Sequence, residues 1–335
     1  MMRIAVLTSG GDAPGMNACI RAVVRKGLCE GMEVVGVRRG FEGLISGDLV
    51  VMTSRSVGDI LHRGGTILKS ARSEEFKTEE GRARALRQIE MNGVDAVIGI
   101  GGDGTYRGLA SLAAMGVPTI GIPATIDNDI GSTEYSIGFD TVCNTVIDAV
   151  NKIRDTASSH ERVYVVEVMG RNSGHIAIAS GLACGAESIL TPEIECTMDE
   201  VCARVKDGAR QGKTHSIILV AEGANSLARQ LCPEVAPGQK VHLIGQEIGR
   251  RTGFDTRVIM LGHIQRGGSP SAADRILASR FGAKAVALLI AGEPVSAVLG
   301  LFEGVMRSAA FDEALMMKRS CKMEYYELAN ILSSL

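Results

Sequence analysis

Residues 97–129, VIGIGGDGTYRGLASLAAMGVPTIGIPATIDND, decide the fold. An apolar run breaks into GGDGT (101–105), is followed by apolar residues at helical spacing, and returns as a second apolar run that breaks into PATIDND (123–129). This order predicts a strand, a glycine turn, a helix that begins near Thr105, a second strand and an acidic loop. Such a right-handed βαβ unit brings its two loops out at the same edge of a parallel sheet.

The glycine turn suits an anionic ligand. Gly101, Gly102 and Gly104 permit backbone angles that are forbidden to other residues, and they let a ligand approach the main chain closely. The helix start directs N–H groups and partial positive charge outward. Asp103 would repel a bare phosphate, so it indicates a cation such as Mg²⁺ between carboxylate and phosphate. The alternative is an ordinary strand-to-helix turn without a ligand.

The acidic loop supplies a pair of carboxylates. In an extended segment Asp127 and Asp129 would lie on one side, roughly 7 Å apart. One suits a general base and the other a group that orients a hydroxyl or holds a cation, and Thr125 adds a hydroxyl for a phosphate oxygen. The alternative is a polar turn held by local hydrogen bonds of Asp and Asn side chains.

The composition limits the class of protein. The chain has 335 residues, which favours two domains, and a formal net charge of −2, which argues against a nucleic-acid or membrane-surface binder. Its 8 cysteines form no CxxC pair. No signal peptide and no apolar run near 18 residues is apparent, so we expect a cytoplasmic protein.

The pattern of strand, glycine turn and helix recurs at SGGDAPGMN (9–17) and MGRNSGH (169–175). Polar side chains near these and later strand ends are candidate ligand groups: Arg72, Arg171, Glu222, His263 and Arg266. Arg21 and Arg25 are neighbours on a helix and by themselves indicate solvated charges. Five further expectations are a loop at 40–47, a helix at 57–61, a surface excursion at 225–243, a helix cap at Ser269, and two or three helices in the remainder.

Together these features describe a kinase for a phosphorylated, hydroxylated small molecule. In phosphoryl transfer the protein mainly positions the reactants and neutralises charge, and a carboxylate takes the hydroxyl proton. Glycine turns, an aspartate suited to Mg²⁺, an acidic pair and arginines at strand ends meet these needs.

At this point the chain resembles a known family. GGDAPGMN, GGDGT, PATIDND, GFDT, MGRNSG, LTPE, AEG and GHIQRGGSPSAADR occur between positions 10 and 275 in the order found in bacterial 6-phosphofructokinases. The resemblance implies two three-layer α/β domains with mainly parallel sheets and an active site in the cleft between them. Residues 1–138 with about 265–315 would bind nucleotide, and about 139–264 with 316–335 would bind sugar phosphate.

The implied activity is the glycolytic transfer of the γ-phosphoryl group of MgATP to the 1-hydroxyl of fructose 6-phosphate, by a homotetramer. Asp127 matches the catalytic base, with Thr125, Asp129 and Arg171 as its partners. The positions that match nucleotide and Mg²⁺ contacts are Gly11, Arg72, Ser73, Gly102, Asp103, Gly104, Thr105 and Gly108, with Asp103 toward the metal and Ser73 a departure from the usual residue. The sugar-phosphate positions are Thr125, Asp127, Asp129, Met169, Gly170, Arg171, Glu222, His263 and Arg266, joined by Arg162 and Arg257 from an adjacent subunit.

The resemblance also implies an effector pocket for ADP or phosphoenolpyruvate between subunits. The matching residues are Arg21, Arg25, Arg154, Gly185, Glu187, Lys213 and His215. Ser54 replaces a family arginine and Gln211 a family lysine. The loss of two cations weakens the expectation of strong effector control.

The phosphoryl donor follows from two small residues. Pyrophosphate users of the family carry Asp and Lys where this chain has Gly104 and Ala124, so we expect ATP. The alternatives are a pyrophosphate-dependent enzyme, an NAD or lipid kinase that shares only GGDGT, and a non-catalytic regulatory subunit. The intact set of Asp103, Asp127 and Arg171 speaks against the last of these.

Overall fold

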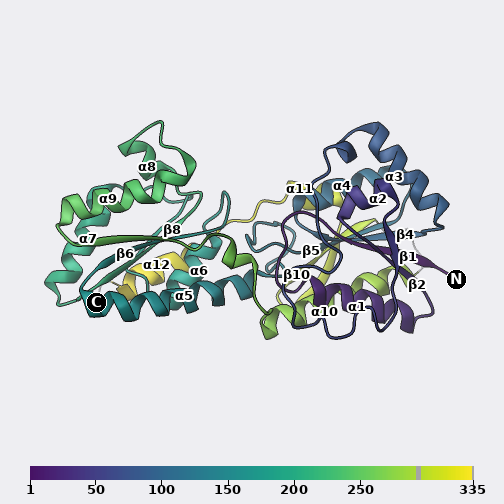
Figure 1. Ribbon diagram of the computed structural model, residues 1–335, viewed down its shortest axis with the longest axis horizontal. Coiled ribbons are helices and arrows are strands. Elements are labelled where there is room, and N and C mark those ends of the chain that lie inside the picture. Colours follow the sequence, from purple (N-terminus) through teal and green to yellow (C-terminus); the bar gives the residue numbers. More distant parts are fainter. Residues whose placement is uncertain (292–295, 334–335) are drawn as a thin grey trace. The chain divides into compact units, whose positions relative to one another are not determined.

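The computed structural model describes residues 1–291 and 296–333. The chain forms two compact units (Figure 1). Unit 1 comprises Met1–Thr141 and Arg266–Arg319, and unit 2 comprises Val142–Gln265 and the segment that begins at Ser320. The chain therefore passes between the units three times, after Thr141, after Gln265 and after Arg319.

Unit 1 contains a seven-stranded sheet in the order β11-β10-β5-β4-β1-β2-β3. The inner strands pair in parallel, and one antiparallel strand lies on each edge. The strands are β1 (Arg3–Thr8), β2 (Glu33–Val37), β3 (Leu49–Val51), β4 (Ala96–Gly101), β5 (Thr119–Pro123), β10 (Ala297–Phe302) and β11 (Val305–Ala309).

Helices cover both faces of this sheet (Figure 1). One face carries α1 (Met16–Cys29) and α10 (Ala272–Ile290), which pack against each other. The other carries α2 (Gly40–Ser46), α3 (Glu79–Met91), α4 (Asp103–Ala114) and α11 (Phe311–Met316), with the short 3₁₀ helix η1 (Glu75–Lys77) beside α3.

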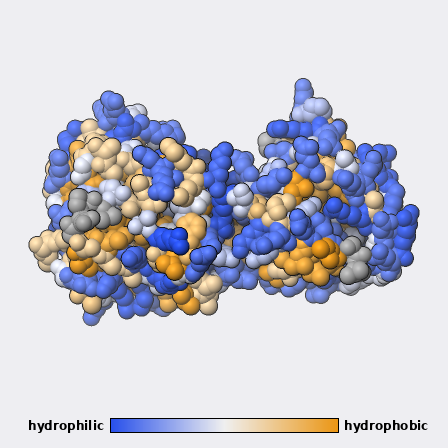
Figure 2. Space-filling view, turned by 180° about the vertical axis from the view of Figure 1, so that it is seen from behind, coloured by the Kyte–Doolittle hydropathy of each residue, from blue (hydrophilic) through white to orange (hydrophobic). Residues whose placement is uncertain are grey.

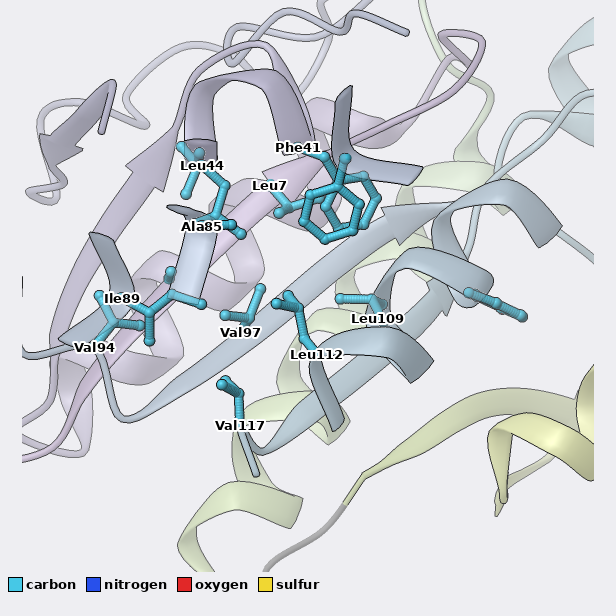
Figure 3. Close-up of a cluster of buried hydrophobic side chains, with 14 of the residues drawn as sticks. Leu7, Phe41, Leu44, Ala85, Ile89, Val94, Val97, Leu109, Leu112 and Val117 are labelled. Carbon is cyan, nitrogen blue, oxygen red and sulfur yellow. The ribbon is translucent and has the colours of Figure 1, made fainter. Parts of the chain in front are cut away.

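The apolar runs become the core of unit 1 because a parallel sheet covered on both faces buries every residue of its central strands. All six residues of β4 are buried. Figure 3 shows Val97 of β4 next to Leu112 of α4, and Leu7 of β1 and Leu109 of α4 belong to the same cluster. Phe41 of α2 joins this cluster. This packing holds α4 against the sheet and fixes the position of its first turn.

Unit 2 has a four-stranded, fully parallel sheet in the order β7-β8-β6-β9. The strands are β6 (Val163–Val168), β7 (Ser188–Leu190), β8 (Ser216–Ala221) and β9 (Thr256–Met260). In Figure 1 one face carries α5 (Phe139–His160), α6 (His175–Cys184) and α12 (Met323–Ser333), and the other carries α7 (Met198–Arg210), α8 (Ser226–Leu231) and α9 (Lys240–Thr252). The 3₁₀ helices are η2 (Pro237–Gln239) and η3 (Gly262–Arg266).

The predicted fold class, α/β with mainly parallel sheets, is confirmed. The central βαβ unit is present as β4, α4 and β5, with β4 and β5 paired in parallel. Helix α4 begins at Asp103, two residues before the predicted start, so the aspartate belongs to the helix rather than to the turn.

Two local predictions in unit 1 are wrong. Residues 40–47 are not a loop but contain α2, because Arg39 and Gly47 take left-handed angles (φ 59° and 73°) at its two ends while apolar side chains between them are buried. Residues 57–61 are not a helix but a series of turns, in which Asp59 has φ 54°.

Residues 225–243 are mostly exposed or half-buried, as expected of a surface excursion, but they also contain α8 and the start of α9. Two other predictions for the second half of the chain are wrong. The cap of α10 is Ser271, which accepts the amide of Asp274 at 3.2 Å, whereas the Ser269 hydroxyl donates to His62 O at 2.8 Å. The C-terminal remainder includes β10 and β11 as well as helices, and the partly exposed β11 has no continuous apolar run that would have revealed it.

On the face drawn in Figure 2, both units show hydrophilic residues interspersed with patches of hydrophobic ones. Among residues 1–291 and 296–333, no helix is both long and apolar enough to cross a membrane.

Candidate active site

The carboxyl ends of three neighbouring strands define a loop cluster in unit 1. Strand β4 lies between β5 and β1, and the registers Thr8↔Ile100 and Gly101↔Pro123 bring the three strand ends level. The chain leaves β1 toward β2 through α1, on one face, and reaches β4 through α3, on the other. Ligands of open α/β sheets bind beyond the strand ends at such a switch point.

Main-chain hydrogen bonds join the three loops. Ser9 N donates to Ile100 O at 3.1 Å, and Ala124 N donates to Gly101 O at 3.0 Å. The Thr105 hydroxyl donates to Ser9 O at 3.2 Å. The three loops therefore form one scaffold whose shape depends little on exposed side chains.

The glycine turn uses none of the left-handed angles that glycine permits. None of Gly101, Gly102 and Gly104 has a positive φ, and Gly102 lies at φ −97°. Gly101 is needed for close packing, because a Cβ there would lie 2.2 Å from Thr105 Oγ1. A Cβ on Gly104 would meet nothing within 4 Å, so this exposed position borders open space.

Asp103 is the first residue of α4 and is exposed. Within the described part of the chain, no three His, Cys, Asp or Glu side chains gather as a metal cage. A single carboxylate at a helix start fits a Mg²⁺ ion that brings most of its ligands as phosphate oxygens and water. The residues present therefore fit a metal that arrives with the nucleotide.

The acidic loop is a turn rather than an extended segment. Asn128 has φ 51°, so the prediction that Asp127 and Asp129 lie along one side of extended backbone is wrong. Asn128 accepts Ser136 N at 2.9 Å through Oδ1, and Asp127 N donates to Thr125 Oγ1 at 3.2 Å. Asp127 itself is only 2% exposed. Asn128 thus secures the turn between Asp127 and Asp129.

Two arginines of unit 1 lie at or near the loop that follows β1. Arg266 Nη1 donates to Asp12 O at 3.2 Å, and a Cβ on Gly11 would lie 2.6 Å from the same nitrogen, so Gly11 makes room for the guanidinium. Arg72 is exposed. The segment leading to it is anchored by Asn17, which donates to Arg63 O at 3.1 Å and accepts Ile67 N at 2.8 Å.

Three of the residues matched to nucleotide contacts are engaged within unit 1. The Ser73 hydroxyl donates to Glu42 Oε2 at 2.8 Å. Thr105 is buried, and its hydroxyl donates to Ser9 O. A Cβ on Gly108 would lie 2.4 Å from the ring of Phe41, which in turn stacks on Phe76 with 4.3 Å between centroids. Thr105 thus links the start of α4 to the loop after β1, and Gly108 lets α4 pack closely against Phe41 of α2.

A second loop cluster follows the strands of unit 2. Glu222 N donates to Val168 O at 2.9 Å, and Glu222 Oε1 accepts Arg171 N at 2.6 Å. Arg171 is exposed with φ 52°, and Gly170 has φ 140°. A Cβ on Gly223 would lie 2.3 Å from Arg171 O. One carboxylate oxygen of Glu222 thus shapes the arginine loop.

Sequence reasoning missed Gln265, a fully buried side chain that holds the same loop. Its Oε1 accepts Met169 N at 3.2 Å and its Nε2 donates to Gly262 O at 3.1 Å. The exposed His263 is carried on the 3₁₀ turn that Gln265 secures. Its place inside GHIQRGG was the available signal. Asn17, at the end of GGDAPGMN, was missed in the same way.

The field at this edge is acidic. Burial raises the pKa of Glu167 in β6, the nearby Glu222 raises it further, and Lys240 opposes both. An arginine that follows β6 keeps its positive charge in these surroundings, because a guanidinium does not lose its proton, and it can therefore pair with a phosphate.

Arg162 and Arg257 lie near the amino ends of β6 and β9, whereas the Arg171 loop follows the carboxyl end of β6. Arg162 precedes β6, and Arg257 pairs in register with Tyr164 near the start of that strand. Both guanidinium groups meet Asp255 Oδ2, at 2.7 and 3.1 Å. The length of β6 separates them from Arg171 by about 20 Å of backbone. Within one copy of unit 2 they do not join the Arg171 loop.

The effector positions of unit 2 form two adjoining groups. Arg154 donates to Gly185 O at 3.2 Å and lies 3.4 Å from His215 Nε2. Lys213 donates to Ser333 O at 2.6 Å. A cavity of about 460 Å³ is lined by Glu187, Arg204, Asp207, Gly208, Gln211, Lys213, Asn330, Ile331 and Ser333. Arg21 and Arg25 lie on α1 in unit 1.

Loops at the carboxyl ends of parallel strands, with a glycine turn at a helix start and a nearby carboxylate, are typical of α/β proteins that bind phosphorylated ligands. Comparison with known proteins narrows this class. The model of the phosphofructokinase family matches residues 3–289, and the chain belongs to that family.

Relatives match over the full length. The chain is 54% identical over 337 residues to the ATP-dependent 6-phosphofructokinase of Halothermothrix orenii, covering 99% of this chain and 100% of the relative. It is 52% identical over 336 residues to a protein of the same name from Clostridium botulinum, with coverage of 99% and 100%.

Solved structures share the fold. Phosphofructokinase from Saccharomyces cerevisiae superposes with a TM-score of 0.85 at 34% identity, over 99% of this chain and 48% of that chain, so this chain spans about half of the yeast protein. A pyrophosphate-dependent phosphofructokinase from Marinobacter aquaeolei gives a TM-score of 0.84 at 20% identity, covering 97% and 86%. That likeness concerns the fold alone.

Proposed function

We propose that the chain transfers the γ-phosphoryl group of MgATP to the 1-hydroxyl of fructose 6-phosphate, producing fructose 1,6-bisphosphate and ADP. The observation that carries the proposal is the placement of the Gly102–Gly104 helix start beside the Asp127 loop, on the adjacent strands β4 and β5. The names of the full-length relatives support the same donor and acceptor.

In the proposed reaction Asp127 accepts the proton of the 1-hydroxyl. The hydroxyl oxygen forms a bond to the γ-phosphorus while the bond from that phosphorus to the bridging oxygen breaks, and ADP leaves. The N-terminus of α4 stabilises charge on the transferring group. Mg²⁺ held by Asp103 and the phosphates would neutralise further charge. Thr125 and Asp129 orient the reactants around the base.

The acceptor's 6-phosphate is the proposed ligand of the arginines. Met169, Gly170, Arg171, Glu222 and His263 of unit 2 and Arg266 of unit 1 would contact the sugar phosphate. Arg162 and Arg257 lie at the far edge of their own sheet, so we assign them to the site of an adjacent copy. This assignment requires an oligomer, which we propose to be a homotetramer.

The donor assignment rests mainly on Gly104. This glycine borders open space, whereas Ala124 is 1% exposed and lies within the scaffold. A carboxylate at position 104 would oppose the phosphates of ATP, and glycine leaves them room. Gly11, Arg72 and the first turn of α4 complete the proposed nucleotide contacts.

The cavity beside Lys213 favours a second proposed function, the binding of ADP or phosphoenolpyruvate as an effector. Its lining offers the cations of Arg204 and Lys213 together with two carboxylates. Arg154, Gly185, Glu187 and His215 lie in or near it, and Arg21 and Arg25 would come from an adjacent copy. Gln211 and Ser54 supply no charge, so we expect a modest response.

A coupled assay on the purified protein tests these proposals. We expect turnover that requires fructose 6-phosphate, ATP and Mg²⁺, with a change in the dependence on fructose 6-phosphate when ADP or phosphoenolpyruvate is added. Turnover with pyrophosphate and none with ATP would overturn the donor assignment. A lack of turnover with either donor, despite binding of fructose 6-phosphate, would favour the regulatory-subunit alternative.

A further inference from the structure

The chain crosses from unit 1 to unit 2 for the last time after Arg319, and the residues just before this crossing make an unusual set of contacts with unit 1. The guanidinium of Arg319 donates through Nη1 to Thr133 O and through Nη2 to Glu134 O. Lys318 pairs in antiparallel fashion with Ile130. Two successive carbonyls of one loop are therefore held by the fork of a single side chain, which is a geometry that lysine cannot reproduce.

The loop held by Arg319 is the one that carries Asp127. Asn128 donates through Nδ2 to Glu134 O at 3.3 Å, the same carbonyl that Arg319 contacts, and accepts Ser136 N through Oδ1. Asn128 directly follows the proposed base and has a left-handed backbone. Because Arg319 and Asn128 share Glu134 O as acceptor, a displacement of Arg319 also changes the hydrogen bonding of Asn128, the residue next to Asp127.

On the unit 2 side, the first anchoring contact is made two residues after Arg319, at Cys321. Cys321 is 7% exposed, and its thiol donates to Glu193 Oε1 at 3.1 Å. The same oxygen accepts Gly174 N at 2.8 Å, at the end of the loop that carries Arg171. A Cβ on Gly174 would lie 2.7 Å from Glu193 Oε2, so glycine permits this approach.

We propose that residues 318–321, here called the strap, couple the Asp127 loop to the Arg171 loop. Arg319 and Cys321 are its positioning residues, and the consequence for turnover rests on the proposed function. Each of the contacts described above lies within one unit, and residues 319–321 connect the two units covalently. Two residues of backbone span at most about 7 Å, so a shift at one anchor pulls on the other.

Hydrogen exchange on the full-length, assembled protein tests the coupling directly. Arg319→Gln removes the fork, and Cys321→Ala removes the thiol donor. We expect each variant to increase exchange in both loops, residues 125–136 and 170–175, because each anchor supports the other. An increase confined to the loop nearest the substitution, in both variants, would overturn the coupling.

Matched controls separate coupling from general loosening. Arg280→Gln removes an arginine of unit 1 that donates to Gly304 O at 2.8 Å, and Cys29→Ala changes an exposed cysteine after which α1 ends. Neither control is expected to change exchange in the two loops. Cys321→Ser keeps a donor and should restore the protection that Cys321→Ala loses.

Turnover supplies a second and independent measurement. Misplacement of a catalytic group by about 1 Å can cost up to about 100-fold in rate, so we expect Arg319→Gln to lower kcat roughly tenfold, with an unchanged KM for ATP. Arg319→Lys should not restore it. In an Asp127→Ala background Arg319→Gln should cause no further loss, because both substitutions act through one group.

The outcomes distinguish the two proposals. Multiplicative losses in the double variant, or a kcat equal to that of Arg280→Gln, would overturn the role of the strap in turnover. Near-normal turnover of Asp127→Ala alone would instead overturn the assignment of the base. In that case the exchange measurement still decides whether the strap couples the two loops.

Discussion

The two loop clusters are built in different ways. In unit 1 the loops after β1, β4 and β5 are joined to one another at the strand ends by main-chain hydrogen bonds, such as Ala124 N to Gly101 O, and side chains of Asn128 and Arg319 hold the later part of the Asp127 loop. In unit 2 the loop that carries Arg171 is held by side chains of Glu222, Gln265 and Glu193, each of which accepts one of its amides. The first cluster presents amides and buried carboxylate, and the second presents cations on a loop whose shape depends on its neighbours.

This difference suggests a division of labour. A main-chain scaffold holds its geometry whatever the exposed side chains are, which suits the donor phosphates and the transfer of a proton. A loop held by side chains adapts when its supports move, which suits recognition and control of the acceptor. Substitutions of the chemical groups of unit 1 should therefore affect kcat most, and those of unit 2 should affect use of fructose 6-phosphate.

Asp127 provides the largest expected effect. Since a general base contributes roughly 10²- to 10⁴-fold in rate, Asp127→Ala should lower kcat by at least 10²-fold with little change in the KM for either substrate. Steady-state kinetics checks this. Asp59→Asn, at a 97% exposed carboxylate of unit 1, is the matched control and should leave kcat unchanged. Near-normal turnover of Asp127→Ala would contradict the assignment of the general base to this residue of unit 1.

The arginines of unit 2 should give the next largest effect. Arg171→Asn keeps a residue that tolerates φ 52°, and Arg162→Ala removes a cation of the opposite edge. A charged hydrogen bond contributes about 1.5–3 kcal/mol, so each variant should lose roughly 10- to 100-fold in kcat/KM for fructose 6-phosphate.

Mixing the two arginine variants sharpens the comparison further. If Arg162 serves the site of an adjacent copy, hybrids formed by dissociation and reassembly contain intact sites and recover part of the activity. The activity of the mixture against each variant alone is the measurement. A mixture no more active than its components would place all the arginines of a site in one chain.

Two substitutions of Gly104 distinguish the effect of added charge from the effect of added volume on the use of ATP. Gly104→Ala adds a methyl where nothing lies within 4 Å, so turnover with ATP should fall less than about threefold. Gly104→Asp adds a carboxylate beside the phosphates, and kcat/KM for ATP should fall more than tenfold. Parallel assays with ATP and pyrophosphate measure the preference. Equal losses in the two variants would mean that volume, and not charge, selects the donor.

The smallest expected effect is a difference between the two units in how their stability changes as the pH falls. Hydrogen bonds from Arg250 and Arg251 lower the pKa of Glu247 in α9 to about 2, while burial raises the pKa of Asp274 in α10. Below its unfolded pKa of about 4.3, Glu247 loses its stabilising effect as pH falls toward about 2. Asp274 behaves oppositely, because its contribution is present below its unfolded pKa of about 3.9 and is lost as pH rises through the raised folded value.

Pepsin cleavage measured between pH 4.5 and 2 checks this sign. The difference in protection of unit 2 between the wild-type chain and Glu247→Gln should shrink as pH falls. Arg210→Gln, whose side chain pairs with Asp207 on another exposed helix face, serves as the control. A difference that grows at lower pH would contradict the assignment of the shift to the two arginines.

Patterns along the chain predicted the central unit well because each of its signals is local. The apolar runs of β4 and β5 and the helical spacing of α4 need no knowledge of distant residues. By contrast, α2 is stabilised by buried contacts of Phe41 and Leu44 and by the left-handed ends at Arg39 and Gly47, none of which shows in an apolar period. Strand β11 lies at a lateral edge of the sheet with three of its five residues exposed and none fully buried, so it lacked a recognisable apolar run.

The sequence alone determined the α/β class, the order of strand ends and the chemical groups near them, since these depend on side-chain type and spacing. Tertiary structure decided how those groups are held. It showed that Gly101 serves packing rather than unusual angles, that Asn128 turns the acidic loop, and that Arg162 and Arg171 lie at opposite ends of one sheet. These facts depend on contacts between residues far apart in the chain, which a local pattern does not encode.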